Sequence, residues 1–172
     1  MKKFELTAEF VTNVFGKKLF RIKALVAFGD VSAGELGGFV EKEENLSNNG
    51  NAWVSGNAWV SGDAQVSGNA WVSGNARVSG DARVSGDARV YGDADYAVVT
   101  GFGHCFRATT FFRCKDKILR VQCGCFYGDL AQFREIVKKT HGDSKYAKEY
   151  LAIADLMELH FSDEEENQEA AK

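Results

Sequence analysis

Residues 51–92 read NAWVSG NAWVSG DAQVSG NAWVSG NARVSG DARVSG DARVYG, seven near-copies of one six-residue unit. A period of six is typical of parallel β-helices, in which coils of extended chain stack on one another. Valine favours an extended backbone because it is branched at Cβ, and residues two apart lie on the same face of a strand. The alanine and valine of each unit are therefore predicted to point into a narrow β-helix, with the Gly-Asn and Gly-Asp pairs at its corners.

The spacing also predicts which residues stack from coil to coil. Three units make one coil of about 18 residues in hexapeptide β-helices. Valines 18 apart then share an interior wall, and the outward residues fall on three faces. These faces carry Trp53, Trp71 and Arg89; Trp59, Arg77 and Asp95; and Gln65 and Arg83. A single coil cannot bury its own interior, so both open ends of the rod need a cap.

Composition and charge exclude several classes of protein. The net charge is −3, and residues 162–172 contribute −4 of it, which leaves +1 for the rest. This is not the charge of a basic nucleic-acid-binding domain, so a nucleic-acid partner is not expected. The longest apolar run, Ala24–Phe28, is too short to span a membrane, and the N-terminus lacks the apolar core of a signal peptide. Four cysteines clustered in the C-terminal third indicate a reduced, cytoplasmic protein and not a disulfide framework.

The regions outside the repeats predict further segments. Residues 1–30 contain two apolar-rich stretches around the turn signal FGKK, and we predict a hairpin that caps the first coil. The β-helix is expected over residues 31–106, where Val40 and Leu46 are degenerate repeat positions and Tyr96 and Phe102 plug the last coil. A small α+β module, a β-hairpin plus two helices, is expected over residues 107–161. Residues 162–172 are expected to form a disordered acidic tail.

The predicted C-terminal hairpin has two alternating stretches, 109–114 and 118–126. If residues 116–117 form the turn, Phe112 pairs with Val121, and both share an apolar face with the hairpin cysteines that meets the helices. Asp129 and Gln132 predict a capping box at the start of a helix over residues 130–139. A second helix is predicted over residues 144–160.

Two stretches resemble known protein groups. The segment AGELGGFVEKEENLS at residues 33–47, followed by GNAWV and the hexapeptides, resembles the YdcK-like group of bacterial and prophage proteins. The resemblance spans residues 1–95 and is carried by Gly34, Gly37, Gly38, Val40 and Leu46. It implies a left-handed β-helix, a fold often labelled a transferase on architecture alone, and no particular activity. Residues 111–133 and 140–151 resemble a ββαα module common in phage-encoded proteins.

An acyltransferase using acyl-coenzyme A is one functional alternative. Acyltransferases built from hexapeptide repeats use a histidine as general base beside a groove between coils. The chain has no histidine before His104, and His104, His141 and His160 all follow the repeats. No catalytic residue and no cofactor are therefore predicted, and binding without turnover is favoured.

A zinc site is a second alternative. Its ligands would be Cys114, Cys123, Cys125 and His141, with His104 and Cys105 as further candidates. Structural zinc sites favour two cysteines separated by two to four residues, and these cysteines do not have that spacing. Because free cysteine is among the most buried residue types, packing in an apolar core is favoured over metal binding.

The strongest binding signal is the set of aromatic and arginine residues on the repeat faces, namely Trp53, Trp59, Trp71, Arg77 and Arg89. Trp and Arg are enriched at the energetic centres of protein interfaces. The set could be a face for side-by-side association into a homodimer or homotrimer, or a surface covered by the C-terminal module. It could also be a platform for a small molecule or a host protein, and self-association is favoured over that platform. We expect a non-enzymatic binding or scaffold protein. The phage-like resemblance implies a role in blocking a host macromolecule, such as a defence component.

Overall fold

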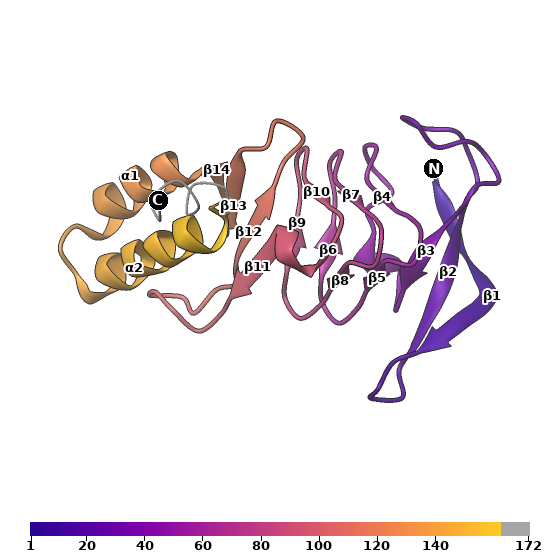
Figure 1. Cartoon of the computed structure of the whole chain (residues 1–172), viewed down its shortest axis with the longest axis horizontal. Coiled ribbons are helices and arrows are strands. Elements are labelled where there is room, and N and C mark those ends of the chain that lie inside the picture. Colours follow the sequence, from indigo (N-terminus) through magenta and orange to yellow (C-terminus); the bar gives the residue numbers. More distant parts are fainter. Residues whose placement is uncertain (163–172) are drawn as a thin grey trace, which may run out of the picture.

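The computed structural model describes residues 1–162, which form an elongated molecule (Figure 1). An N-terminal hairpin lies at one end, a rod of short stacked strands follows, and a sheet with two helices lies at the other end. The predicted acidic tail falls outside the described residues, apart from Ser162.

The rod is a β-solenoid made of two-residue strands. These are β4 (Trp53–Val54), β5 (Trp59–Val60), β6 (Gln65–Val66), β7 (Trp71–Val72), β8 (Arg77–Val78), β9 (Arg83–Val84) and β10 (Arg89–Val90). Strands three units apart pair in parallel, so that Trp53 lies beside Trp71 and Trp71 beside Arg89. The same offset places Trp59 beside Arg77 and Gln65 beside Arg83. This register is the one that the hexapeptide spacing predicts. Asp95 is the exception, because it lies in the 3-10 helix η2 (Asp93–Asp95) that follows the last coil.

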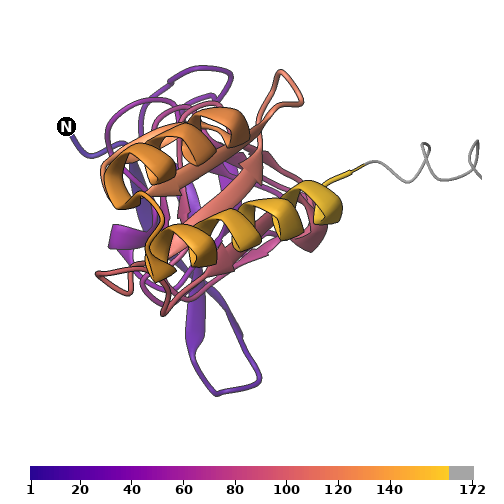
Figure 2. The same ribbon diagram turned by 90° about the vertical axis from the view of Figure 1, so that its left-hand side faces the viewer.

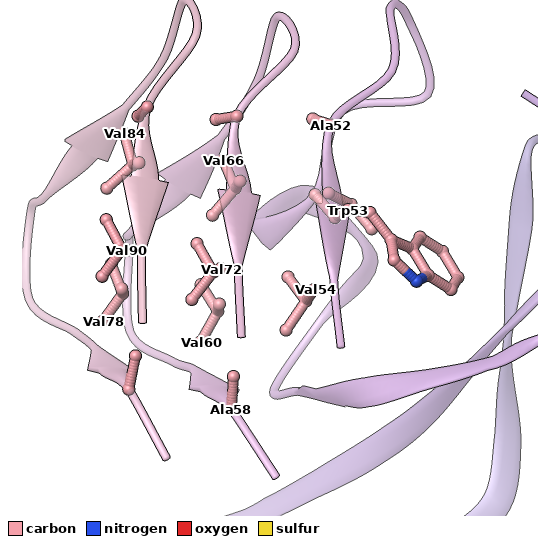
Figure 3. Close-up of a cluster of buried hydrophobic side chains, with 14 of the residues drawn as sticks. Ala52, Trp53, Val54, Ala58, Val60, Val66, Val72, Val78, Val84 and Val90 are labelled. Carbon is pink, nitrogen blue, oxygen red and sulfur yellow. The ribbon is translucent and has the colours of Figure 1, made fainter. Parts of the chain in front are cut away.

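The interior of the rod holds only the alanine and valine of each unit (Figure 3). Each of them from Ala52 to Val90 is fully buried. At the corners the glycines adopt left-handed backbone angles, with φ of +64° at Gly74. A Cβ added to Gly74 would lie 2.5 Å from the carbonyl oxygen of Tyr91 in the next coil, so this corner needs glycine for space as well as for conformation.

The N-terminal segment supplies an antiparallel hairpin and an incomplete coil. Strands β1 (Phe4–Thr12) and β2 (Lys18–Ala24) form the hairpin, and β3 (Leu36–Val40) pairs with β2 and then in parallel with β5. Val40 lies beside Val60, and Leu46 bridges to Val66. Val40 and Leu46 are therefore the degenerate repeat positions that the sequence predicts.

Two buried polar side chains close the N-terminal end of the rod. Lys3 is 4% exposed, and its Nζ donates to the carbonyl oxygen of Ala52 at 2.8 Å. Burial lowers the pKa of Lys3 to about 8. Asn45, at the end of the 3-10 helix η1 (Glu43–Asn45), donates through Nδ2 to the carbonyl oxygen of Ala64 at 2.8 Å. These side chains satisfy buried carbonyl groups that no neighbouring strand reaches.

The opposite end is closed by acceptors for the last coil's amides. The amide of Arg77 donates to Asp93 Oδ1 at 2.8 Å, and that of Arg83 donates to Thr110 Oγ1 at 2.9 Å. These backbone carbonyl and amide groups at the two ends of the rod have hydrogen-bond partners within the chain. A second rod therefore cannot extend this one by pairing with them.

The C-terminal module is a four-stranded antiparallel sheet and two helices. The strands are β11 (Tyr96–Val99), β12 (Thr109–Arg113), β13 (Leu119–Cys123) and β14 (Phe126–Asp129), in that order in the sheet. Helix α1 (Leu130–His141) begins with the capping box of Asp129 and Gln132 that the sequence predicts, and α2 (Lys145–His160) is capped by Ser144. The parallel strand pairs of the rod end at β10, and the C-terminal module begins at Tyr96, the first residue of β11.

The predicted hairpin register is wrong by one residue. Phe112 pairs with Arg120, and Phe111 pairs with Val121. A slip of one residue exchanges the two faces of a strand. Phe111 and Val121 therefore pack against the helices, whereas Phe112 and Cys114 pack against the rod. Figure 2 shows both helices in front of this sheet, which separates them from the rod.

Two further expectations for this region are corrected. The strand predicted to run to residue 126 ends at Cys123, where Gly124, with φ of +58°, turns the chain into β14. Cys125 therefore lies in an exposed turn and not in the core. Phe102 is 42% exposed in the loop after β11, whereas Tyr96 packs against the rod core as predicted and Phe112 also packs there.

Candidate functional site

The predicted tryptophan–arginine surface is divided by the fold. Trp53 points away from the coil interior, as predicted, but it is fully buried beneath the N-terminal segment (Figure 3). The ring of Phe28 lies 5.5 Å from its own, in an edge-on arrangement. A Cβ on Gly37 would lie 2.7 Å from Trp53 Cζ2, so glycine lets β3 approach the indole. The expectation that Trp53 is on the surface is wrong, because the N-terminal cap uses it as a packing surface.

The other four residues of this set are partly or fully exposed and contact their own rod. Trp71 Nε1 donates to Ser55 Oγ at 3.0 Å. Arg89 Nη1 donates to the carbonyl oxygen of Asn69 at 2.8 Å. On the second face, the guanidinium of Arg77 lies 4.5 Å from the ring of Trp59. These contacts stabilise neighbouring coils, and they leave small aromatic areas in place of one continuous platform.

The candidate zinc ligands lie on different sides of the C-terminal sheet. Cys114 is buried on the rod side, 3.9 Å from Tyr127 Oη, and burial raises the pKa of its thiol. Cys123, Cys125 and His141 line a pocket on the helix side. Across residues 1–162, no three His, Cys, Asp or Glu side chains are grouped closely enough to hold a metal ion.

That pocket is a mainly apolar cavity with a volume of about 410 Å³. It lies between α1, the start of α2, the loop before β12 and the turn between β13 and β14. Its walls include four aromatic rings and two aliphatic side chains, and polar groups lie among them. The lining residues are His104, Cys105, Arg107, Cys123, Cys125, Phe126, Phe133, Ile136, Val137, Thr140, His141, Tyr146 and Tyr150. Ligand sites in proteins are typically concave and apolar, with a few polar groups that orient the ligand.

Ring contacts and hydrogen bonds hold the walls of this pocket in place. The His104 ring lies edge-on to Tyr146, 5.7 Å between centroids, and the His141 ring lies 5.8 Å from Tyr150. Tyr150 Oη donates to the carbonyl oxygen of Phe102 at 3.4 Å. Burial, reinforced by the neighbouring Cys123 thiol, raises the pKa of Tyr150 to about 12, so its phenol stays protonated at neutral pH.

The loop that carries His104 is fixed to α2. The amide of Gly103 donates to Glu149 Oε2 at 2.9 Å, and a Cβ on Gly103 would collide with the Tyr150 ring. His104 Nδ1 lies 3.5 Å from Cys105 Sγ. This arrangement places an imidazole and a thiol beside apolar walls, so the pocket can bind an apolar group and donate hydrogen bonds to a polar atom next to that group.

Sequence reasoning missed this pocket, although it named several of its residues. The sequence offers Cys105, Cys123 and Cys125 as core residues or metal ligands, and His104 and His141 as metal ligands or as a catalytic base. The helix pattern predicts one apolar side that contains Phe133, Ile136 and Val137, and nothing in that pattern separates a core position from a pocket wall. In the structure Phe133 and Val137 are buried, whereas Ile136 is 37% exposed.

Comparison with known proteins bears on the rod. Residues 64–80, 70–86 and 82–94 each match the family described as the YdcK Beta solenoid repeat. Residues 64–94 of the rod are therefore similar to this repeat family. These repeats end before the sheet and helices that form the pocket, so the family says nothing about the pocket itself. No curated protein matches the chain. Among the helices of residues 1–162, none is long and apolar enough to cross a membrane.

Proposed function

We propose that the chain is a non-enzymatic binding protein, in which the YdcK-type rod is a rigid scaffold and the C-terminal module engages a partner protein. The single observation that carries this proposal is the preformed apolar pocket of about 410 Å³ between α1 and α2. Its four aromatic walls suit an aromatic or aliphatic side chain of a partner, since such anchors in pockets dominate many protein interfaces. The partner is a host macromolecule, in keeping with the resemblance of residues 111–133 and 140–151 to a module of phage-encoded proteins.

Acyl transfer is the less favoured alternative because of the place of the histidines. An acyltransferase of this architecture would need an imidazole beside a groove between coils. His104 instead packs on Tyr146 at the start of α2, and His141 packs on the same helix. We therefore expect no release of thiol from acetyl-coenzyme A above background.

Three finer features belong to the same proposal. The coils wind left-handed, as in other hexapeptide solenoids, because they share the alanine–valine–glycine unit. The protein acts in the cytoplasm, where its four free thiols stay reduced.

The protein associates side by side as a dimer or trimer through the partly exposed Trp59 and Trp71. Light scattering should show a lower mass for Trp71→Ser, and an unchanged mass would refute that contact.

Selection from a displayed library of random peptides tests the binding function. The immobilised full chain should enrich peptides with an aromatic or aliphatic anchor residue. Ile136→Glu places a charge in the apolar wall and should abolish this enrichment. Leu156→Glu is the matched control, since Leu156 is 56% exposed on α2 and does not line the pocket. Failure to enrich any peptide, or equal loss with both variants, would refute the proposal.

A further inference from the structure

The last hexapeptide departs from the others at one outward position. Six of the seven units have serine after the valine, and the seventh has Tyr91. Tyr91 is 59% exposed, so the larger side chain does not fill the core of the rod. The departure places an aromatic ring on the surface where the rod meets the C-terminal sheet.

Tyr91 lines a cavity of about 500 Å³ between β10 and the β12–β13 hairpin. The other lining residues are Arg89, Asp95, Arg113, Cys114, Lys115 and Lys117. Four cationic side chains and one carboxylate therefore line the cavity. Asp95 is already engaged, because its Oδ2 accepts from the amide of Tyr91 at 2.9 Å and its Oδ1 lies 3.8 Å from Arg113 Nε. Lys115 and Lys117 place two positive charges in the same cavity as an aromatic ring.

The two lysines are available to a ligand. Within residues 1–162, neither Lys115 nor Lys117 has a carboxylate within ion-pair distance. Asp116, between them in sequence, pairs with Arg120 at 2.7 Å, and Asp87 Oδ1 accepts from Asn69 Nδ2 at 3.2 Å. An exposed lysine without an acidic partner keeps its full charge for an anion.

The backbone at Lys117 adds a second departure from local preference. Its φ is +64°, a left-handed conformation that favours glycine in a hairpin turn of this kind. Its amide donates to the carbonyl oxygen of Cys114 at 2.8 Å, which closes the turn. Non-glycine residues held in such conformations cluster at functional sites. Here the chain has a lysine where glycine would fit more easily, next to the only tyrosine in the repeat pattern.

We propose that this cavity binds a nucleoside diphosphate, with the phosphates against Lys115 and Lys117 and the base stacked on Tyr91. Phosphate groups attract ammonium groups and form charge-assisted hydrogen bonds with them. Bases stack on exposed aromatic side chains with little dependence on sequence. A cavity of about 500 Å³ whose lining includes both positive charge and an aromatic ring suits a small ligand that carries phosphate and a base. The site lies on the rod side of the sheet, so it is separate from the pocket between the helices.

Isothermal titration of the full chain with ADP, pyrophosphate and adenosine at low salt tests the site. ADP should bind at one site per chain and adenosine much more weakly. Tyr91→Ser, which restores the serine of the other repeats, should weaken ADP about tenfold and leave pyrophosphate unchanged. Lys117→Gly suits the left-handed backbone and should weaken both ADP and pyrophosphate. Arg83→Gln, which removes one positive charge from a different face of the rod, should change neither by more than about twofold.

Several results would overturn this proposal. They are absence of ADP binding to a folded chain, equal binding of ADP and adenosine, and equal loss of affinity with Arg83→Gln and Lys117→Gly. Thermal unfolding of each variant shows whether it is folded before titration. The peptide selection tests the pocket beside Ile136, and the ADP titration tests the cavity beside Tyr91. Failure of either experiment therefore leaves the other proposal standing.

Discussion

Shortening Val72 to alanine tests how the interior of the rod stabilises the fold. Val72 is fully buried, between Val54 and Val90 on the same wall. Losing its two methyl groups removes about 1.6 kcal/mol of burial energy, at about 0.8 kcal/mol per group. The stacked coils cannot close around the void without breaking their ladders, which adds about 1 kcal/mol. Val72→Ala should therefore lower the free energy of unfolding by about 2.5 kcal/mol.

Urea unfolding monitored by circular dichroism measures this change. The midpoint should fall while the slope stays constant, because the surface exposed on unfolding is the same. The thermal midpoint should fall by about 5–10 °C for a chain of this size. The matched control is Gln65→Ala, an exposed position of the same rod that should change stability by less than about 0.5 kcal/mol. Equal effects of Val72→Ala and Gln65→Ala would refute the assigned register.

Three further predictions concern the corners, the cap and the pH dependence. Gly74→Ala and Gly80→Ala both place an alanine in the left-handed backbone conformation, which lowers the free energy of unfolding by a similar amount in each variant. In Gly74→Ala alone, the added Cβ also lies 2.5 Å from a carbonyl oxygen. Urea unfolding should therefore show about 1–3 kcal/mol more loss of stability for Gly74→Ala than for Gly80→Ala. Thr110→Val removes the acceptor of the Arg83 amide and should cost about 1–2 kcal/mol in the same assay, whereas no change would contradict the cap. Burial raises the pKa of Tyr127 to about 12, so its contribution to stability is full below the unfolded pKa of about 10 and is lost as pH rises to about 12. Unfolding at a series of pH values should show a smaller alkaline loss for Tyr127→Phe, and parallel curves would contradict this assignment.

The rod was predictable because its repeat specifies side chain, strand and corner at the same time. A valine every six residues fixes which residues stack, and the observed pairing of Trp59 with Arg77 follows from counting alone. The N-terminal cap was predictable as a hairpin but not in its contacts. The repeat spacing does not show that Gly37 lets β3 lie on Trp53. Trp53 belongs to the first hexapeptide, whereas Gly37 precedes the hexapeptides and follows no regular spacing from them.

The C-terminal sheet shows how one residue changes an interpretation. A turn placed at residues 116–117 pairs Phe112 with Val121, and the actual turn pairs Phe111 with Val121. Both phenylalanines are apolar and both are fully buried, so alternation alone could not distinguish the two registers. The sheet is covered on both faces, by the rod and by the helices, which removes the polar face that normally fixes a register.

The candidate site was only partly predictable for a related reason. His104 and Tyr146 are 42 residues apart in sequence, and the fold brings their rings together across a loop and a helix. Sequence spacing carries information about local motifs and repeats. The residues of this pocket come from four separate segments, so no regular spacing in the sequence connects them. Departures from the repeat, such as Tyr91, are the exception because the repeat itself defines what is expected at each position.

Chemical-shift mapping of a selected apolar-anchor peptide on the full chain tests the central claim most directly. Isoleucine methyl groups and tryptophan indole N–H groups would be labelled in the same sample. The proposed function predicts that the methyl resonance of Ile136 shifts on titration, while the indole resonances of Trp59 and Trp71 stay in place. Shifts at those two indoles with an unchanged Ile136 would contradict it and would move the binding surface to the rod.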